Sequence, residues 1–390
     1  MGFFRRLAAG LMMFALLVGL AAPVQAASPG IAVTALPAYY GFTNTVTLTN
    51  QGSADALDVV ANVVLLAPQT PYAHVTLTGE SVSPASTFRD QFGNVVGQFN
   101  WPVLKPKQSV TLTLHYQATS SDISYRLPAS YPPYNTQSAL YKFYTNPALE
   151  HTDGVDTGAP QIRQLDAAVT RGIGSPYLRA QALFQWIVHN IHYNYSLQAS
   201  GSAVRTLATH LGICSDFADL YVSMLRTDGI PARLVGGYVT NNGGNQGGFH
   251  QWTEFYLPSV GWVVADPTWG QYGYFASLED DWHIPLYDGI RPDISVHWQF
   301  SSASSGRPQL AIHYHYHFVT EQSPSAAKSV KLPILSVSPP VTMHHVALNP
   351  WASLWIHWQH VLIDTAIQIL HSLEALVSRI TAHSGARQGA

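Results

Sequence analysis

The residue best able to do covalent chemistry in this chain is Cys214, the single cysteine among 390 residues. The tripeptide Gly212-Ile213-Cys214 leads directly into a predicted helix, which places the thiol at or near the amino terminus of that helix. Backbone N–H groups and the positive end of the helix dipole favour a thiolate there, and the thiolate is the nucleophile. The same N–H groups can receive the oxyanion of a tetrahedral intermediate. The alternative interpretation is a small, buried core residue.

A cysteine nucleophile also needs a cation beside it, because Asp216 and Asp219 in the first helical turns oppose thiolate formation. A histidine can act as general base and imidazolium partner, and a carboxylate can orient that histidine. His250 opens one predicted strand and Asp266 closes the next, in a hairpin that turns at residues 258–261. The two ends of a hairpin meet in space, so the sequence predicts a Cys214-His250-Asp266 centre.

The pairing register of this hairpin decides whether the side chains of His250 and Asp266 can lie on the same face. In an unbulged hairpin, opposed residues have numbers with a constant sum, and each strand alternates faces with a period of two. His250 and Asp266 both have even numbers, so they share a face only if the connecting loop has an odd number of residues. We therefore predict a three- or five-residue loop, such as Pro258 to Val260, or a bulge in one strand.

Three blocks around these residues resemble the transglutaminase-like superfamily, and the resemblance runs from about Pro160 to Thr268. One departure is Gln251, which stands where a small residue is more common. The blocks are Gly212 to Ala218 with Leu225-Arg226, Gly229 to Arg233 and Gly237-Tyr238; His250 to Glu254; and Gly261-Trp262 through Asp266-Pro267-Thr268, with Ile191-His192-Tyr193 upstream.

The resemblance implies a papain-like core, a Cys-His-Asp triad at Cys214, His250 and Asp266, and acyl transfer from peptide or protein amides to water or to an amine. It implies no cofactor and no metal. Proteolysis, deamidation and crosslinking stay open, because all three share the acyl-enzyme and differ only in what resolves it. The alternative of another class is a non-catalytic cell-envelope binding or scaffold protein that retains the fold.

Helices precede strands in the segment that carries these blocks. Ser175 followed by Pro176 is typical of a helix start, and Gly229 suits the left-handed end of a helix that begins near Cys214. Strands are predicted from Ala232, from His250 and from Trp262. The order indicates an α+β catalytic domain over residues 159–320, with helices packed on an antiparallel sheet. The buried stripe of the Ser175 helix is predicted to comprise Ala180, Leu183, Phe184, Ile187 and Ile191.

Residues 27–120 contain short β-branched or alternating runs with Gly, Pro and Asn between them, which favours a β-sandwich of immunoglobulin-like architecture. No catalytic constellation occurs there, so its expected role is positioning or binding. Residues 121–158 are predicted to be a connector, with an irregular Pro- and Tyr-rich stretch from Leu127 to Asn135.

Residues 1–26 have the pattern of a secretory signal peptide, with Arg5 and Arg6 before an apolar run and Val24-Gln25-Ala26 after it. A retained membrane anchor is the alternative. We expect a secreted or extracytoplasmic protein. Removing the two arginines takes the formal charge from −3 to −5 (−3 − 2), and no Lys/Arg cluster remains, which argues against nucleic acid as a partner.

The carboxyl-terminal part is predicted to be a linker, residues 321–348, and an amphipathic helix, residues 349–383, that starts at Asn349-Pro350. Polar residues interrupt its apolar stripe too often for a membrane span. Packing against its own protein or a partner is the first interpretation. Association with the cell envelope or a membrane surface is the second, weakened by the absence of a basic face.

Three other features have two interpretations each. The imidazoles of His313, His315 and His317 share one face of a predicted strand, which favours an exposed face over a metal site. The run Glu279-Asp280-Asp281 lacks the further ligands of a calcium site. The glycine-rich loop from Asn241 to Gly248 is a flexible connection or a lid over the cleft.

Overall fold

The computed structural model describes residues 30–33, 37–150, 154–240, 247–289, 294–301 and 306–321. The predicted signal peptide, the predicted C-terminal helix, nearly all of the linker and most of the 241–248 loop lie outside these residues. Among the helices described, none combines the length and the apolar character needed to cross a membrane.

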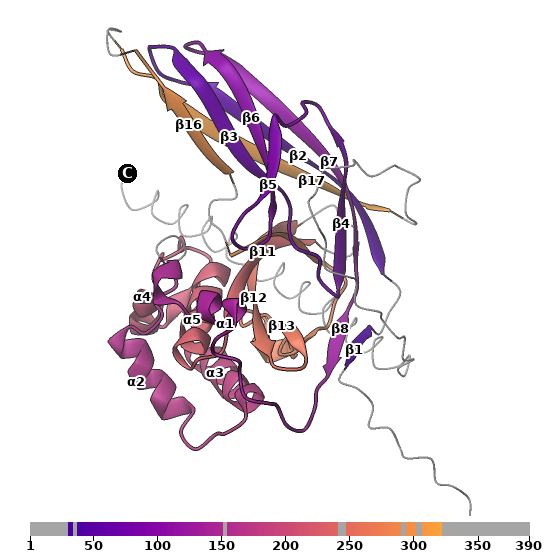
Figure 1. Ribbon diagram of the computed structural model, residues 1–390, viewed down its shortest axis with the longest axis vertical. Helices are drawn as coiled ribbons and strands as arrows, with labels where there is room; N and C mark the ends of the chain where they lie inside the picture. The colour runs from indigo at the N-terminus through magenta and orange to yellow at the C-terminus, as the bar shows by residue number, and fades with distance from the viewer. Residues whose placement is uncertain are drawn as a thin grey trace, which may run out of the picture.

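The upper half of the molecule is a sandwich of two four-stranded antiparallel sheets (Figure 1). One sheet has the order β16-β3-β6-β5 and the other β17-β2-β7-β4. The strands are β2 (Ala38–Asn50), β3 (Ala56–Leu66), β4 (Ala73–Glu80), β5 (Ser86–Arg89), β6 (Val95–Leu104), β7 (Ser109–Ser120), β16 (Ile294–Gln299) and β17 (Leu310–Glu321).

The sandwich closes because its strands bury every second residue. Along β2 the even-numbered side chains from Tyr40 to Leu48 face inward, and they share one core with side chains of β3 such as Val63. Phe42 stacks between Tyr116 and Phe318, with ring centroids 4.6 and 4.5 Å away. Aromatic pairs of this kind add about 0.5–1.5 kcal/mol beyond the burial of their area.

The predicted boundaries of the sandwich were wrong. Residues 27–120 do not complete it, because β16 and β17 come from the stretch predicted to belong to the 159–320 domain. β17 pairs with β2 from Leu310 opposite Asn50 to Glu321 opposite Tyr39, which covers an edge that would otherwise be open. An alternating pattern identifies a strand but not the strand it pairs with. The immunoglobulin-like architecture stays a prediction.

The predicted connector, residues 121–158, is partly regular. It contains β8 (Ile123–Arg126), α1 (Ala139–Tyr144) and η1 (Pro147–Glu150). β8 lies between β1 (Gly30–Val33) and β14 (Ser277–Leu278) in a small three-stranded sheet. The irregular stretch predicted from residue 127 to 135 is confirmed.

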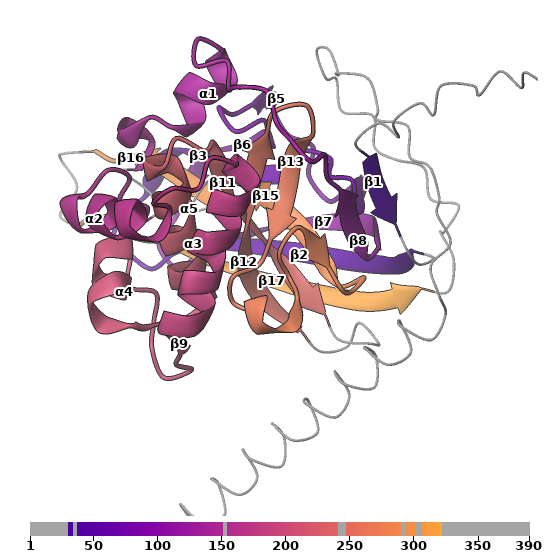
Figure 2. The same ribbon diagram turned by 90° about the horizontal axis from the view of Figure 1, so that it is seen from below.

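The lower half of the molecule packs helices on one face of another four-stranded antiparallel sheet, of order β13-β12-β11-β15 (Figure 2). This is the predicted α+β arrangement. The helices are α2 (Pro160–Val169), α3 (Pro176–Asn190), α4 (Ala203–Thr209) and α5 (Cys214–Thr227), with the short strands β9 (His192–Tyr193) and β10 (Leu211–Gly212) between them; the sheet strands are β11 (Ala232–Thr240), β12 (Gly247–Leu257), β13 (Gly261–Ala265) and β15 (His283–Asp288), with η2 (Gly270–Tyr272) after β13.

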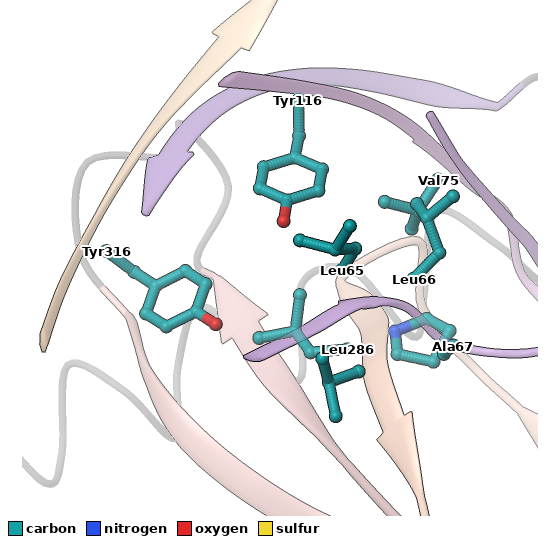
Figure 3. A pocket seen from close by; sticks show the side chains of 9 residues that line it. Leu65, Leu66, Ala67, Val75, Tyr116, Leu286 and Tyr316 are labelled. Atoms are coloured by element: carbon teal, nitrogen blue, oxygen red, sulfur yellow. The ribbon is translucent and has the colours of Figure 1, made fainter. Parts of the chain in front are cut away.

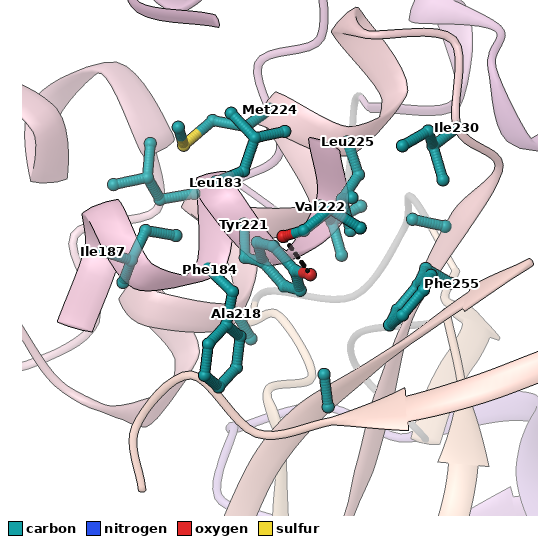
Figure 4. Packing of buried hydrophobic residues seen from close by; sticks show 14 of the residues in the cluster. Leu183, Phe184, Ile187, Ala218, Tyr221, Val222, Met224, Leu225, Ile230 and Phe255 are labelled. Carbon is teal, nitrogen blue, oxygen red and sulfur yellow. Dashed lines mark hydrogen bonds between the residues drawn. The ribbon is translucent and has the colours of Figure 1, made fainter. Parts of the chain in front are cut away.

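The predicted start of α3 and end of α5 are confirmed. The Ser175 hydroxyl accepts the N–H of Leu178, and Gly229 adopts a left-handed φ of 76° directly after α5. The predicted apolar stripe of α3 is buried against α5 (Figure 4). There the Tyr221 hydroxyl donates to the Ala180 carbonyl oxygen at 3.0 Å.

Helix α5 is enclosed on all sides, since every residue from Ser215 to Arg226 is buried. Helices α2, α3 and α4 contact it on one side, and strands β11 and β12 contact it on the other. The first turn of α5, which begins at Cys214, is therefore fixed by the whole domain rather than by local sequence.

The two halves of the molecule meet along β15. Ile284 and Leu286 of this strand belong to the sandwich core, although the strand itself pairs with β11. A cavity of about 10 Å³ lies at this junction, lined partly by Leu65, Tyr116 and Tyr316 (Figure 3). Its size suits about one water molecule, so it is a packing gap and not a substrate site.

Arg233 of β11 is a buried cation. Its guanidinium contacts Glu254 at 2.9 Å and Asp288 at 2.8 Å, and it lies 4.3 Å from the ring centre of Trp262. Arg233 thus has a structural role, because the two carboxylates would be uncompensated without it.

Replacing Arg233 with Met is expected to lower the free energy of unfolding by about 3–5 kcal/mol, because two buried carboxylates lose their counter-charge. Urea unfolding followed by circular dichroism measures the effect. Arg171→Met is the control at an exposed position, with an expected change within about 0.5 kcal/mol. Equal stability of the two variants would contradict the assignment.

Candidate active site

The hairpin of β12 and β13 has the odd loop that the register condition predicted. Leu257 opposes Gly261, so the loop is Pro258, Ser259 and Val260. The Val260 N–H donates to the Leu257 carbonyl oxygen at 3.1 Å, and Ser259 takes a left-handed φ of 67°. With this three-residue loop, the numbers of opposed residues in the two strands add to an even sum. His250 and Asp266, which both have even numbers, therefore lie on the same face of the hairpin.

His250 and Asp266 are joined by a buried hydrogen bond. The distance from His250 Nε2 to Asp266 Oδ2 is 2.6 Å, and the Asp266 side chain is completely buried. Asp266 Oδ1 accepts the N–H of Thr268 at 2.9 Å, which fixes the carboxylate plane. The predicted meeting of these two side chains is therefore observed.

Charge, not burial, decides the ionisation of this pair. Burial raises the pKa of Asp266, but attraction to His250 and the hydrogen bond from it outweigh burial and hold that pKa well below its usual range. Burial likewise lowers the pKa of His250, but the charge of Asp266 and its hydrogen bond raise it to about 10. His250 is thus an imidazolium at neutral pH.

Cys214 is the first residue of α5, and its thiol hydrogen-bonds with His250. Burial raises the pKa of the thiol, but this hydrogen bond, the charge of His250 and the backbone N–H of Gln251 lower it below its usual value. The structure thus brings Cys214, His250 and Asp266 together, with the pKa of the thiol lowered by the imidazole beside it.

Asp216 holds the start of α5 in place. Its Oδ2 accepts the N–H of Ile213 at 2.9 Å and its Oδ1 accepts the N–H of Ser200 at 2.6 Å. Gly212 is required beside it, because a Cβ on Gly212 would lie 2.5 Å from the Asp216 Cβ. The sequence analysis treated Asp216 only as a charge opposing the thiolate and missed this role, which a carboxylate at the third helical position can signal.

Gln251, the departure from the family pattern, also has a structural partner. Its side-chain Nε2 donates to Asp219 Oδ1 at 3.3 Å in a fully buried contact. The larger side chain therefore links β12 to α5 beside the thiol. Its backbone N–H faces the thiol, as described above.

Two aromatic side chains that sequence reasoning did not assign to the site border it. The Trp269 ring stacks on His250, with centroids 5.1 Å apart and an interplanar angle of 19°. The phenolic oxygen of Tyr193 accepts the backbone N–H of Cys214. Their positions in the sequence could have indicated that they border the site. Trp269 directly follows the Asp266 block, and Tyr193 ends the upstream segment that resembles the family.

Sequence reasoning also missed His283 and gave Asp280 a different interpretation. His283 Nε2 lies 3.3 Å from Asp266 Oδ2, and its Nδ1 lies 2.9 Å from Asp280 Oδ1. Asp280 further accepts the Trp282 N–H at 2.8 Å and the Tyr274 hydroxyl at 2.7 Å. These hydrogen-bond donors already use the Asp280 carboxylate, which a calcium ion at this segment would have needed as a ligand.

The three imidazoles of β17 lie on an exposed face, as expected, but the opposite face is packed only in part, because Ile312 and Tyr314 are exposed as well. His313, His315 and His317 are exposed, whereas Phe318 is buried. Tyr316 also points inward, where its hydroxyl accepts the side-chain amide of Asn44 at 2.9 Å.

Residues 163–267 match the model of the Transglutaminase-like superfamily. This part of the chain is therefore a transglutaminase-like core, as the three sequence blocks predicted. A protein-glutamine gamma-glutamyltransferase from Pseudomonas aeruginosa is 32% identical over 125 residues, which are 29% of this chain and 19% of the relative. An uncharacterized protein, YebA, from Bacillus subtilis is 39% identical over 74 residues, 16% of this chain and 10% of that protein.

These matches span about a fifth and about a tenth of the relatives' own lengths. A solved structure of a candidate cysteine protease from Cytophaga hutchinsonii is similar over more of the chain, with a TM-score of 0.51 at 15% identity. It covers 77% of this chain and 96% of its own. At this identity the likeness shows the fold alone.

The lowered pKa of Cys214 predicts an unusually reactive thiol. Iodoacetamide is expected to alkylate Cys214 faster than an ordinary thiol at pH 6, because His250 lowers the pKa of the thiol. His250→Ala should return the thiol to an ordinary pKa and slow alkylation at pH 6 by about 100-fold. Mass spectrometry of the alkylated protein gives the rates, with His297→Ala on β16 as the control. Equally slow alkylation of all three proteins would show a merely structural cysteine.

Proposed function

We propose that this protein is a thiol-dependent enzyme that transfers or hydrolyses acyl groups of peptide or protein amides. The observation that carries the proposal is the buried 2.6 Å contact of His250 with Asp266, with the Cys214 thiol hydrogen-bonded to the same imidazole at the start of a helix. Cys214 is the nucleophile, His250 the general acid and base, and Asp266 the residue that orients it. The transglutaminase-like core supports this assignment.

In the first half-reaction, the Cys214 thiolate attacks the amide carbonyl carbon and forms a C–S bond. The carbonyl oxygen becomes an oxyanion, which lies at the positive end of the α5 helix dipole. His250 then gives its proton to the leaving nitrogen as the C–N bond breaks. The products are a free amine and a thioester on Cys214, and His250 is left neutral.

In the second half-reaction, neutral His250 takes a proton from water or from an incoming amine, which attacks the thioester and releases Cys214. Water gives hydrolysis or deamidation, and an amine gives crosslinking. The relatives include one named a glutamyltransferase and a structure named a candidate protease, so both acceptors stay within the proposal.

A polypeptide substrate is supported by the surroundings of Cys214. Tyr195 is 74% exposed, and its ring lies 4.7 Å from that of Tyr193, which contacts the Cys214 backbone. Such an open aromatic wall suits the flanking residues of a chain more than a small enclosed ligand. A secreted or extracytoplasmic location is proposed with it, on the signal-peptide pattern of residues 1–26.

Cys214→Ala is expected to abolish all amide chemistry while the fold persists. Casein is incubated with a labelled primary amine, and mass spectrometry then measures hydrolysed bonds, deamidated glutamines and amine adducts together. The far-ultraviolet circular dichroism of the variant should equal that of the parent. Activity retained by the folded variant would overturn the proposal, and inactivity of the parent on polypeptide amides would favour the scaffold alternative.

Activity is expected to survive EDTA, because the thiolate, imidazolium and carboxylate suffice for this mechanism without a metal. The same casein assay, with and without the chelator, measures this. Activity lost in EDTA and restored by calcium would contradict the expectation and return attention to the segment Glu279 to Asp281.

A further inference from the structure

One carboxylate oxygen of Asp266 lies within hydrogen-bonding distance of two imidazoles. Its Oδ2 lies 2.6 Å from His250 Nε2 and 3.3 Å from His283 Nε2. The second nitrogen of His283 faces Asp280 Oδ1 at 2.9 Å, and Asp280 Oδ2 accepts the Tyr274 hydroxyl. A continuous chain of hydrogen bonds therefore runs from the thiol partner His250 through Asp266, His283 and Asp280.

The geometry fixes the protonation of His283. An ionised carboxylate only accepts hydrogen bonds, and a neutral imidazole has one N–H and one lone pair. A neutral His283 would therefore turn a lone pair toward Asp266 or toward Asp280. Only the imidazolium, with an N–H on each nitrogen, satisfies both contacts. Burial by itself lowers the pKa of His283, but Asp280 and Asp266 outweigh burial and raise it.

The surroundings hold this charge away from water. The side chain of His283 is completely buried, and its ring meets those of Trp252 and Trp269 edge-on at 5.0 and 5.1 Å. The ionisable groups that face the two imidazoles are Cys214 on α5, Asp266 after β13, and Asp280 and Tyr274 before β15.

The sandwich positions His283. The next residue of β15, Ile284, lies in the sandwich core, and Ser120 at the end of β7 donates its hydroxyl to the His283 carbonyl oxygen at 3.0 Å. Successive residues of a strand point to opposite faces, so anchoring Ile284 in the sandwich turns His283 toward Asp266.

We propose that His283, held by Asp280, is a positioning residue that shares the Asp266 carboxylate with His250 and so sets how tightly His250 holds its proton. The ring centroids of the two histidines are 5.7 Å apart. At this distance the cation of His283 offsets part of the attraction between Asp266 and the His250 imidazolium. His250 then releases its proton to the leaving amine more readily than it would beside an unshared carboxylate. This inference rests on the proposed function only for that last step.

His283→Gln removes the cation and keeps an N–H donor of similar reach. The rate of Cys214 alkylation by iodoacetamide is measured from pH 4 to 11 for the parent, for His283→Gln and for the exposed control His313→Gln. Both inflections of the profile are expected to move to higher pH in His283→Gln, the upper one by about one unit, because the His250 imidazolium loses a neighbouring positive charge. In the amide assay, kcat at neutral pH is expected to fall about tenfold.

The control should match the parent. A purely structural role for His283 would lower rates without moving the inflections, and inflections that stay in place in folded His283→Gln would overturn the inference. Alkylation needs no amide substrate, so a shifted profile together with an inactive parent would sink the proposed function and leave the His283 assignment standing. Slow alkylation of the parent at pH 6 would instead contradict the lowered thiol pKa on which both depend.

A second measurement does not require His283→Gln to fold. In His250→Ala labelled with nitrogen-15 in its histidines, NMR at pH 8.5 should show the His283 ring with both nitrogens protonated. In the parent, the His250 ring should be protonated in the same way. The absence of any imidazolium in the His250→Ala spectrum would overturn the inference.

Discussion

The enclosure of α5 is the constraint on which the rest of the structure depends. Helix α5, which is buried from Ser215 to Arg226, is held by hydrogen bonds to neighbouring segments near both ends. Asp216 accepts the backbone N–H groups of Ile213 and Ser200 at the start, and Arg226 donates to the Ala232 carbonyl oxygen at 2.9 Å near the end. The helix cannot shift along its axis without breaking these contacts. Cys214 consequently meets His250 with little freedom, which is the preorganisation that a nucleophile needs.

Buried charge is the second organising feature of a chain in which only 11% of residues are Asp, Glu, Lys or Arg. Arg233 is paired with Glu254 and Asp288 on one side of the catalytic sheet. Asp266 and Asp280 are paired with two imidazoles near the thiol. In both places each carboxylate has a cationic partner within hydrogen-bonding distance, which offsets the high cost of removing it from water. The two places differ in one respect. The charges around Arg233 are fixed, whereas the second group includes the proton of His250, which moves in the proposed reaction.

The sandwich and the transglutaminase-like core are continuous in their topology. The chain leaves the sandwich after β7, forms the helices and the sheet β13-β12-β11-β15, and returns through β15 to β16 and β17. β15 is the strand common to both parts, since it pairs with β11 and contributes Ile284 to the sandwich core. The sandwich thereby anchors the strand that carries His283 beside Asp266.

Patterns in the sequence were enough to predict several local elements and the approach of His250 to Asp266. The N-cap at Ser175, the stripe of α3, the end of α5 at Gly229 and the odd hairpin loop all follow from rules that act over a few residues, and so they were predictable. The placement of Cys214, His250 and Asp266 was predictable because a helix start and the two ends of one hairpin are local features. That β16 and β17 complete the sandwich became visible only in the tertiary structure. Those contacts join residues from strands far apart in sequence, and the pattern within a strand carries no record of its partner across the sheet.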